Sequence, residues 1–173
     1  MKKNIKFNII VATTLDGKIA KNHNHFSDWT SKEDKIFLHK MLDKSDCIIV
    51  GNNTYKTSIK PLSKRNCIVF TKSVKIIKQA STNCLYINPN NIDITELLKA
   101  KKYKNIDILG GTEVFSYFLG KNLIDEIYLT IEPIIFGTGL PLFQADLNQN
   151  LCYKLKSIKK LNKKGSILLN YIK

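Results

Sequence analysis

The sequence predicts a single-domain α/β protein with a mostly parallel central sheet, helices on both faces and a C-terminal antiparallel hairpin. Short continuous apolar runs bounded by turn residues, typical of buried parallel strands, alternate with segments of helical periodicity. Near the C-terminus, two strand-like segments flank Lys163-Lys164-Gly165, a pattern typical of a hairpin. The length of 173 residues, with no linker or repeat in the sequence, predicts one domain over residues 1–173.

The strands are expected where apolar residues run together or alternate. They are residues 7–12, 47–51, 67–70, 85–87, 106–109, 126–131, 153–161 and 166–172. The helices are expected where capping residues precede helical spacing. They begin at Ser31 and end near Lys44, run from 95 to 102 with Thr95 or Asp93 as the cap, and run from 113 to 119, with a short helix or turn at 53–58.

Two long polar or Gly/Pro-rich segments, residues 14–28 and 133–143, are expected to be loops. A loop of the first length inside a compact domain is often functional. The formal net charge is +14, and 27 of the 28 basic residues are Lys spread along the chain. This bias favours an anionic substrate or phosphorylated cofactor over a specific nucleic-acid partner. The sequence has no apolar run of membrane-spanning length and no signal-peptide pattern, so we expect a cytoplasmic protein without a membrane partner.

The cysteines and histidines show no metal-binding pattern. Cys47, Cys67, Cys84 and Cys152 have no CxxC spacing and lie beside aliphatic residues, so we expect buried structural thiols. The three histidines lack a matching Cys or carboxylate spacing, so no metal site is expected. Motifs for hydrolytic chemistry, such as a P-loop or HExxH, are also missing from the sequence. Hydride transfer needs few side chains because the cofactor carries the reactivity.

Candidate ligand-binding residues follow the expected strands, since ligands of α/β sheets bind beyond the carboxyl ends of the strands. Gly110-Gly111-Thr112 joins a strand to a helix and would let backbone N–H groups approach a phosphate, although a plain turn is the alternative. Asp34 lies in a first helical turn and either caps the helix or binds an N–C–N edge with two hydrogen bonds. Phe37 and Leu38, three and four residues on, favour an inward side chain.

Several segments together resemble the dihydrofolate reductase family over residues 7–143. They are Ala12 to Ala20, Asp28-Trp29 followed by Asp34, Gly51 to Tyr55, Pro61-Leu62 with Arg65, Leu109 to Phe115, and Tyr128 to Thr130. The resemblance implies NADPH-dependent reduction of 7,8-dihydrofolate to tetrahydrofolate, by hydride transfer to the pterin, in a monomer or alternatively a dimer.

The resemblance also implies residue roles. Asp34 would hold the pterin and promote protonation at N5, with Trp29 and Thr130 as its catalytic neighbours. Arg65, the single Arg of the chain, would grip the glutamate tail through its planar fork, unless it is an incidental surface residue. Further substrate contacts are implied at Leu38, Ser58 and Phe115. Cofactor contacts are implied at Ala12, Ile19, Gly51, Asn53, Thr54, Thr71, Lys72, Gly110, Gly111, Thr112, Glu113 and Val114, with a cis peptide joining the two glycines.

Departures from the family pattern leave alternatives open. Asn52 and Glu113 stand where basic residues usually bind the cofactor, which leaves the preference for NADPH over NADH open, and Leu38 replaces a frequent aromatic. Residues 14–20 and 136–143 look more like a sister family, the NADPH-dependent reductase of 5-amino-6-ribosylamino-pyrimidine phosphate in riboflavin biosynthesis. A basic nucleic-acid-binding protein without catalysis is the alternative of another class.

Overall fold

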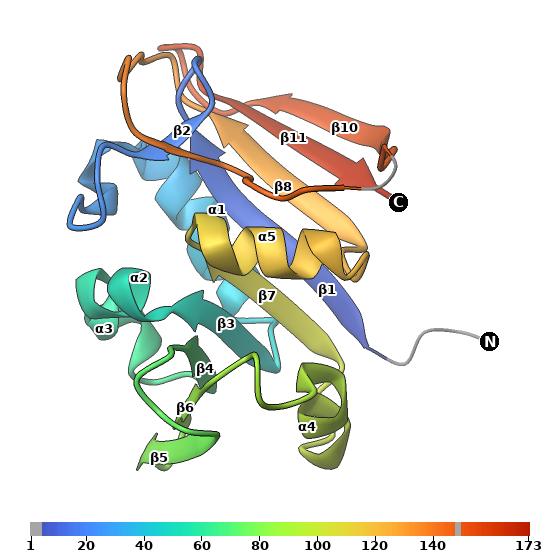
Figure 1. Cartoon of the computed structure of the whole chain (residues 1–173). Helices are drawn as coiled ribbons and strands as arrows, with labels where there is room; N and C mark the ends of the chain where they lie inside the picture. Colours follow the sequence, from blue (N-terminus) through green and yellow to red (C-terminus); the bar gives the residue numbers. More distant parts are fainter. Residues whose placement is uncertain (1–4, 148–149) are drawn as a thin grey trace.

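The computed structural model describes residues 5–147 and 150–173 (Figure 1). Within these residues nine strands form one sheet in the order β10-β11-β8-β1-β7-β3-β4-β6-β5, and β2 pairs with β9. The strands are β1 (Lys6–Thr13), β2 (Lys18–Ala20), β3 (Cys47–Gly51), β4 (Cys67–Phe70), β5 (Ile77–Ser81), β6 (Cys84–Ile87), β7 (Asn105–Gly110), β8 (Glu126–Ile131), β9 (Leu140–Pro141), β10 (Lys154–Lys160) and β11 (Ile167–Ile172).

The helices lie between these strands. They are the 3-10 helix η1 (Ser27–Trp29), α1 (Lys32–Leu42), α2 (Asn52–Thr57), α3 (Ile59–Leu62), α4 (Ile94–Ala100) and α5 (Thr112–Gly120). Ser31 caps α1, with its side chain accepting from the Asp34 backbone N–H, and Asp93 caps α4. None of the helices in the described part of the chain is long and apolar enough to cross a membrane.

The sheet confirms the predicted α/β class. Its central strands β8, β1, β7, β3, β4 and β6 run parallel to one another. The hairpin of β10 and β11 adds an antiparallel edge on one side, and β5 adds one on the other. All seven residues of β10 are exposed, as expected for a lysine-rich edge strand.

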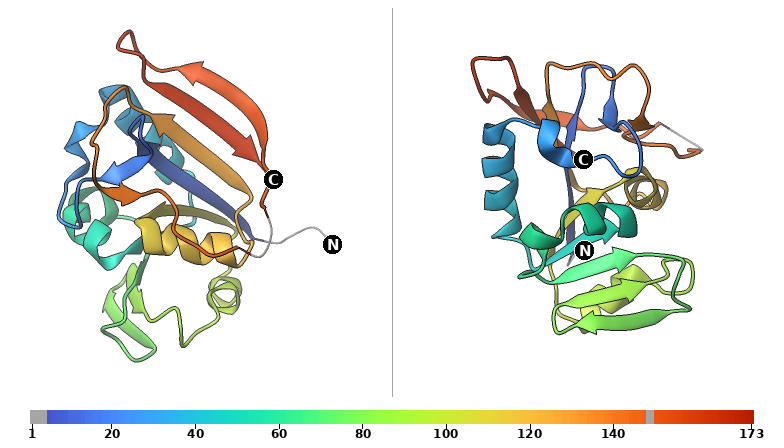
Figure 2. Two further views of the ribbon diagram at one scale, coloured as in Figure 1. Left: turned by 45° about the horizontal axis from the view of Figure 1, so that its top comes forward. Right: turned by 90° about the vertical axis from the view of Figure 1, so that its left-hand side faces the viewer.

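Helices cover both faces of the sheet, and Figure 2 shows α1 and α5 on opposite sides of it. On one face, Ile9 and Ile108 pack against Phe115 and Phe118 of α5. On the other face, Val50 belongs to a second cluster with apolar residues of α1 and α3. Strands buried on both faces need apolar residues at successive positions, which explains the continuous apolar runs in the sequence.

The structure corrects several sequence-based expectations. The two predicted loops contain β2, η1 and β9, which are too short to give a periodic signal. Strand β5 has no predicted counterpart because its residues IKQAS are exposed and do not alternate. Helix α1 ends at Leu42, before the expected Lys44. Cys152 is exposed rather than buried, whereas Cys47, Cys67 and Cys84 are buried.

Candidate active site

A cleft of about 850 Å³ opens beyond the carboxyl ends of the parallel strands. Its walls come from β1, the segment from β2 to η1, α1, α2, the end of β4 and the start of α5. This is where ligands bind in open α/β sheets, and the volume lies in the range of sites for small molecules and cofactors. The cleft is therefore the candidate active site.

Asp34 contributes a buried carboxylate to this cleft, on the side that its helical spacing predicts. Its residue is 7% exposed, and α1 places it next to the end of β8. Burial raises the pKa of the Asp34 carboxyl, hydrogen bonds from the Thr130 and Thr30 hydroxyls lower it, and the charge of Glu132 raises it again. The net direction is upward, so Asp34 holds its proton to a higher pH than a solvated aspartate does.

Trp29 lies in η1 and lines the cleft near Asp34. Its ring packs edge-on against Phe136, with 5.1 Å between the ring centroids. His25 packs on the same Phe136 ring at 5.4 Å, and its Nδ1 accepts from the Lys21 backbone N–H at 3.1 Å. Phe136 therefore connects the loop before α1 to the loop after β8.

Asp16 ties the same two loops together through backbone contacts. Its Oδ2 accepts from Gly137 N at 2.9 Å, and its Oδ1 accepts from Phe136 N at 3.2 Å and from the Thr14 hydroxyl. The pairing of β2 with β9 extends this connection. Gly139, with φ of +151°, permits it, because a Cβ there would lie 2.4 Å from the Ala20 carbonyl oxygen. The two loops form one unit at the rim of the cleft.

The junction of β7 and α5 forms another wall. Gly110 and Gly111 are joined by a cis peptide, as the resemblance implies. Gly110 has φ of +93°, and a Cβ on it would lie 2.5 Å from the Phe115 ring. A Cβ on Gly111 would lie in van der Waals contact with Thr54 Oγ1, at 3.7 Å, and Ile19 Cδ1, at 3.8 Å. Gly111 lines the cleft, so a flat group can approach its backbone there.

The model of the family described as dihydrofolate reductase matches residues 6–138. This chain belongs to the dihydrofolate reductase family. The Bacillus subtilis protein YwjB is 30% identical over 173 residues, covering 95% of this chain and 96% of its own length. The dihydrofolate reductase of Ureaplasma parvum is 28% identical, with 94% of each chain covered. Membership of the family makes the chain an oxidoreductase of this fold.

Solved structures show the same fold at lower identity. A pyrimidine reductase-like protein of Corynebacterium diphtheriae superposes with a TM-score of 0.75 at 16% identity, covering 97% of this chain and 91% of its own. Dihydrofolate reductase of Enterococcus faecalis, complexed with NADP(H), gives 0.66 at 21% identity, with 96% and 95% covered. The deaminase/reductase of Thermotoga maritima gives 0.74 at 20% identity, with 99% of this chain matching 57% of that longer one.

Most of the residues that the family resemblance singles out line the cleft. They are Ala12, Ile19, Trp29, Asp34, Leu38, Gly51, Asn53, Thr54, Ser58, Thr71, Lys72, Gly111, Thr112, Glu113, Val114 and Phe115. Gly110 and Thr130 are buried and do not line it. Thr130 instead reaches Asp34 through its hydroxyl.

Arg65 is not among the residues that line the cleft. Its guanidinium donates to the Pro61 carbonyl oxygen and to the Asp43 carboxylate. Asp43 follows the last residue of α1, and Arg65 lies just beyond α3. The Arg65 guanidinium therefore contacts one acceptor at each of these two helix ends. In this arrangement Arg65 joins two helix ends rather than facing a substrate.

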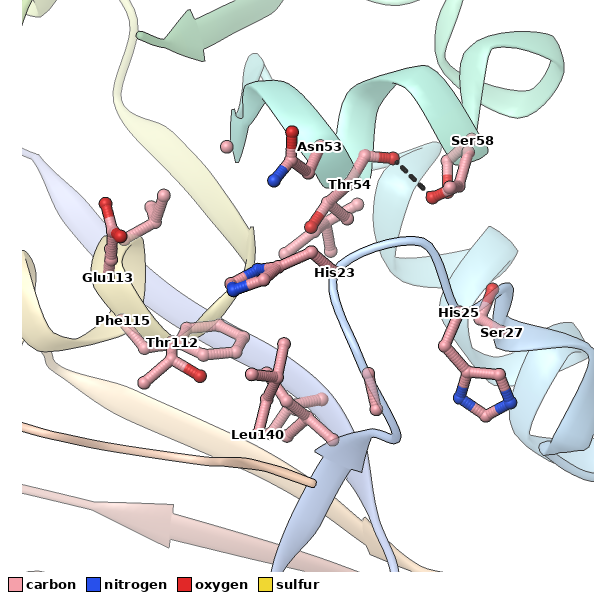
Figure 3. A pocket seen from close by; sticks show the side chains of 18 of the residues that line it. His23, His25, Ser27, Asn53, Thr54, Ser58, Thr112, Glu113, Phe115 and Leu140 are labelled. Atoms are coloured by element: carbon pink, nitrogen blue, oxygen red, sulfur yellow. Dashed lines mark hydrogen bonds between the residues drawn. The ribbon is translucent and has the colours of Figure 1, made fainter. Parts of the chain in front are cut away.

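The family pattern also missed cleft residues. Lys35 of α1, Ser27 of η1 and three side chains of the loop between β2 and η1, namely Asn22, His23 and His25, line the site. Figure 3 shows the His23 imidazole reaching between Thr54 of α2 and Thr112 at the start of α5. The length and polarity of the 14–28 segment indicated a functional loop, but without periodicity they did not indicate which side chains face inward.

Proposed function

We propose that this chain reduces 7,8-dihydrofolate to tetrahydrofolate with NADPH. The observation that carries the proposal is the buried Asp34 carboxyl in the cleft, beside the hydroxyls of Thr30 and Thr130. A carboxylate matches an amidine-like N–C–N edge with two hydrogen bonds, and a pterin presents such an edge. Trp29 and Leu38 would supply apolar walls for the ring.

The remaining cleft fits a nicotinamide dinucleotide. Gly111 lines the cleft without a side chain, beside Thr54 and Ile19, which suits the approach of a flat ring. Thr71 and Lys72, beyond the end of β4, would offer a hydroxyl and an ammonium group to phosphates. When bound, the cofactor supplies the hydride. The excess of positive charge in the chain favours such an anionic ligand.

The part of Asp34 in the reaction is to orient the ring and to favour the protonation of N5 electrostatically. Hydride is delivered to C6 of the pterin, and N5 takes a proton that reaches it from water. Asp34 fixes the ring so that C6 faces the nicotinamide side of the cleft, and burial raises the pKa of its carboxyl above that of a solvated aspartate. The joined loops at the rim, closed by Asp16 and Phe136, would limit the access of bulk water.

A second candidate function is the reduction of a ribosylamino-pyrimidine phosphate, and the positions of Arg65 and Lys35 favour it. Arg65 faces Asp43 instead of the cleft, while Lys35 lines the cleft near Asp34. A point charge suits a phosphate better than it suits the paired oxygens of a glutamate tail. A reductase of the same fold in Thermotoga maritima carries the name of such a substrate.

The two candidates are separated by NADPH consumption with each substrate, followed by absorbance. We expect turnover with dihydrofolate that methotrexate inhibits. Turnover with the pyrimidine phosphate alone would replace the first candidate by the second. A chain that fails to bind NADPH in a fluorescence titration would contradict both.

A further inference from the structure

Glu132, one residue beyond β8, is a buried carboxylate that the proposed reaction does not use. The residue is 3% exposed. Its Oε1 accepts from the Ser31 backbone N–H at 2.8 Å, and its Oε2 accepts from the Ser166 hydroxyl. Ser31 caps α1, and Ser166 lies just before β11. One side chain therefore joins three segments that are far apart in the sequence.

The contacts continue into the turn of the C-terminal hairpin. Asn162 donates to Ser166 Oγ at 2.9 Å and to Glu33 Oε2 at 3.2 Å, while its own oxygen accepts from the backbone N–H groups of Gly165 and Ser166. Glu33 belongs to the first turn of α1, next to Asp34. A hydrogen-bonded path therefore runs from the hairpin turn through Glu132 to the helical turn that carries Asp34.

Glu132 anchors the start of α1 at a cost in desolvation free energy. Burial of a carboxylate is costly even when it is hydrogen-bonded, and a well-packed apolar side chain often stabilises a protein equally well. Here the cost is larger because the negative charge of Glu132 acts on a second buried carboxyl, that of Asp34. Packing alone gives no reason for an acid at this position.

We propose that Glu132 is a positioning residue that holds the first turn of α1 against the end of β8, and so fixes the Asp34 carboxyl and its proton in the cleft. The proposal deepens the function proposed above and rests on the role given there to Asp34.

The electrostatic part of this role follows from the groups around Asp34. Burial and the charge of Glu132 raise the pKa of Asp34, while the Thr130 and Thr30 hydroxyls and the charge of Lys35 lower it. Lys32 and Glu33 of the first turn of α1, and Lys163 and Lys164 of the hairpin turn, are exposed, so water screens their charges. Glu132 is thus the buried charge that favours the protonated form of Asp34.

The decisive variant is Glu132→Gln, which keeps the shape of the side chain and removes its charge. The glutamine oxygen can still accept from Ser31 N–H, and its amide can donate to Ser166 Oγ. The matched control is Glu33→Gln, which removes an exposed carboxylate from the same helical turn. The Asp34 carboxyl carbon is followed by NMR as the pH is varied, and its signal is assigned with Asp34→Asn.

We expect Glu132→Gln to lower the midpoint of the Asp34 titration by about 0.5 pH or more, because a nearby like charge is lost. Glu33→Gln should move it much less. An unchanged midpoint in Glu132→Gln, or an equal movement in the control, would overturn the proposal. The titration needs no substrate, so its outcome is independent of whether dihydrofolate is turned over.

Glu132→Ala tests the positioning part, because it removes both contacts. With the substrate that the chain reduces, we expect kcat to fall at least about tenfold and KM for NADPH to stay within about twofold, since the cofactor lies on the other walls of the cleft. Circular dichroism and the melting temperature show whether the variant is folded. A folded Glu132→Ala with wild-type kcat would overturn the positioning role.

Discussion

The pKa of Asp34 reflects a balance among its neighbours. Burial and the Glu132 charge favour its protonated form, whereas the Thr130 and Thr30 hydroxyls favour its carboxylate form. The net effect raises the pKa of Asp34 above that of a solvated aspartate, in a position where its carboxyl can bind a ring edge. Perturbed carboxyls in a cleft are typical of functional sites, and such sites are often not optimal for stability.

Asp34→Asn tests this balance directly. We expect kcat to fall by about 10²-fold or more, because a neutral amide neither accepts two hydrogen bonds from the N–C–N edge nor favours protonation of N5. The melting temperature should stay the same or rise, since a buried carboxyl is removed. Turnover and thermal unfolding are measured beside Asp28→Asn, which changes an exposed aspartate near the same helix. Near-normal turnover of Asp34→Asn at neutral pH would contradict the assignment.

Substitution of Lys72 tests whether the cleft recognises the 2′-phosphate that distinguishes NADPH from NADH. Because Asn52 and Glu113 are not basic, we propose that Lys72, which lines the cleft beyond the end of β4, binds the 2′-phosphate. We expect Lys72→Ala to weaken NADPH binding about tenfold and NADH binding little, as for the loss of one charge-assisted hydrogen bond. Calorimetric titrations of both cofactors, with exposed Lys75→Ala as control, measure this. Equal weakening for the two cofactors would exclude a 2′-phosphate contact.

At the scale of elements, the site depends on short connections as much as on strands and helices. The strand-to-helix junction at Gly110 and the joined loops of Asp16 and Phe136 are held by backbone contacts between segments that are distant in the sequence. The strands that carry these connections could be predicted from their apolar runs. The pairing of β2 with β9 could not, because two and three residues carry no periodicity.

The junction of β7 and α5 can be tested with one methyl group. Gly110→Ala would place a Cβ 2.5 Å from the Phe115 ring at φ of +93°, so we expect the free energy of unfolding to fall by about 1–3 kcal/mol or more. Gly120→Ala, at the end of α5, meets nothing within 4 Å and is the matched control. Urea unfolding measures both variants. Equal stability of Gly110→Ala and the wild type would show that the junction tolerates a side chain.

Contacts between elements also decide where Arg65 lies. Its position four residues after Pro61 agrees with the family pattern, and the resemblance implies a substrate contact there. The competing acceptors, the Pro61 carbonyl and the Asp43 carboxylate, become visible only once α1 and α3 lie together. The inward orientation of Asp34, in contrast, could be predicted. Ser31 marks the start of α1, and the helical spacing from Asp34 to Phe37 and Leu38 indicates the face that points inward.

At the scale of the whole molecule, the sheet buries polar groups far from the cleft as well. Asp107 of β7 is fully buried, and its carboxyl accepts from Asn8 of the neighbouring β1 at 2.9 Å. Burial raises the pKa of Asp107 from 3.8 to about 6, against the lowering effect of Asn8, Ser45 and Lys6. The folded chain therefore binds this proton more tightly than the unfolded chain does.

The difference in the pKa of Asp107 between the folded and unfolded chains determines how stability changes with pH. Between about pH 4 and about pH 6 the unfolded chain releases the proton first, so stability is lost as the pH rises through this window. We compare the free energy of unfolding of Asp107→Asn with that of the wild type. We expect the difference between them to favour the variant more at about pH 7 than at about pH 4, by up to roughly 3 kcal/mol. Urea unfolding at both pH values measures it, with exposed Asp146→Asn as control. The same difference at both pH values would contradict the buried, raised pKa.

Hydride transfer from NADPH to a pterin, which we propose for this chain, leaves a record in the position of the transferred hydrogen. That position is read by mass spectrometry of the product formed from dihydrofolate and NADPH deuterated at both C4 positions of the reduced nicotinamide. We expect tetrahydrofolate that carries one deuterium at C6, formed much more slowly by Asp34→Asn. Failure to form deuterated tetrahydrofolate, in a folded chain that binds NADPH, would contradict it.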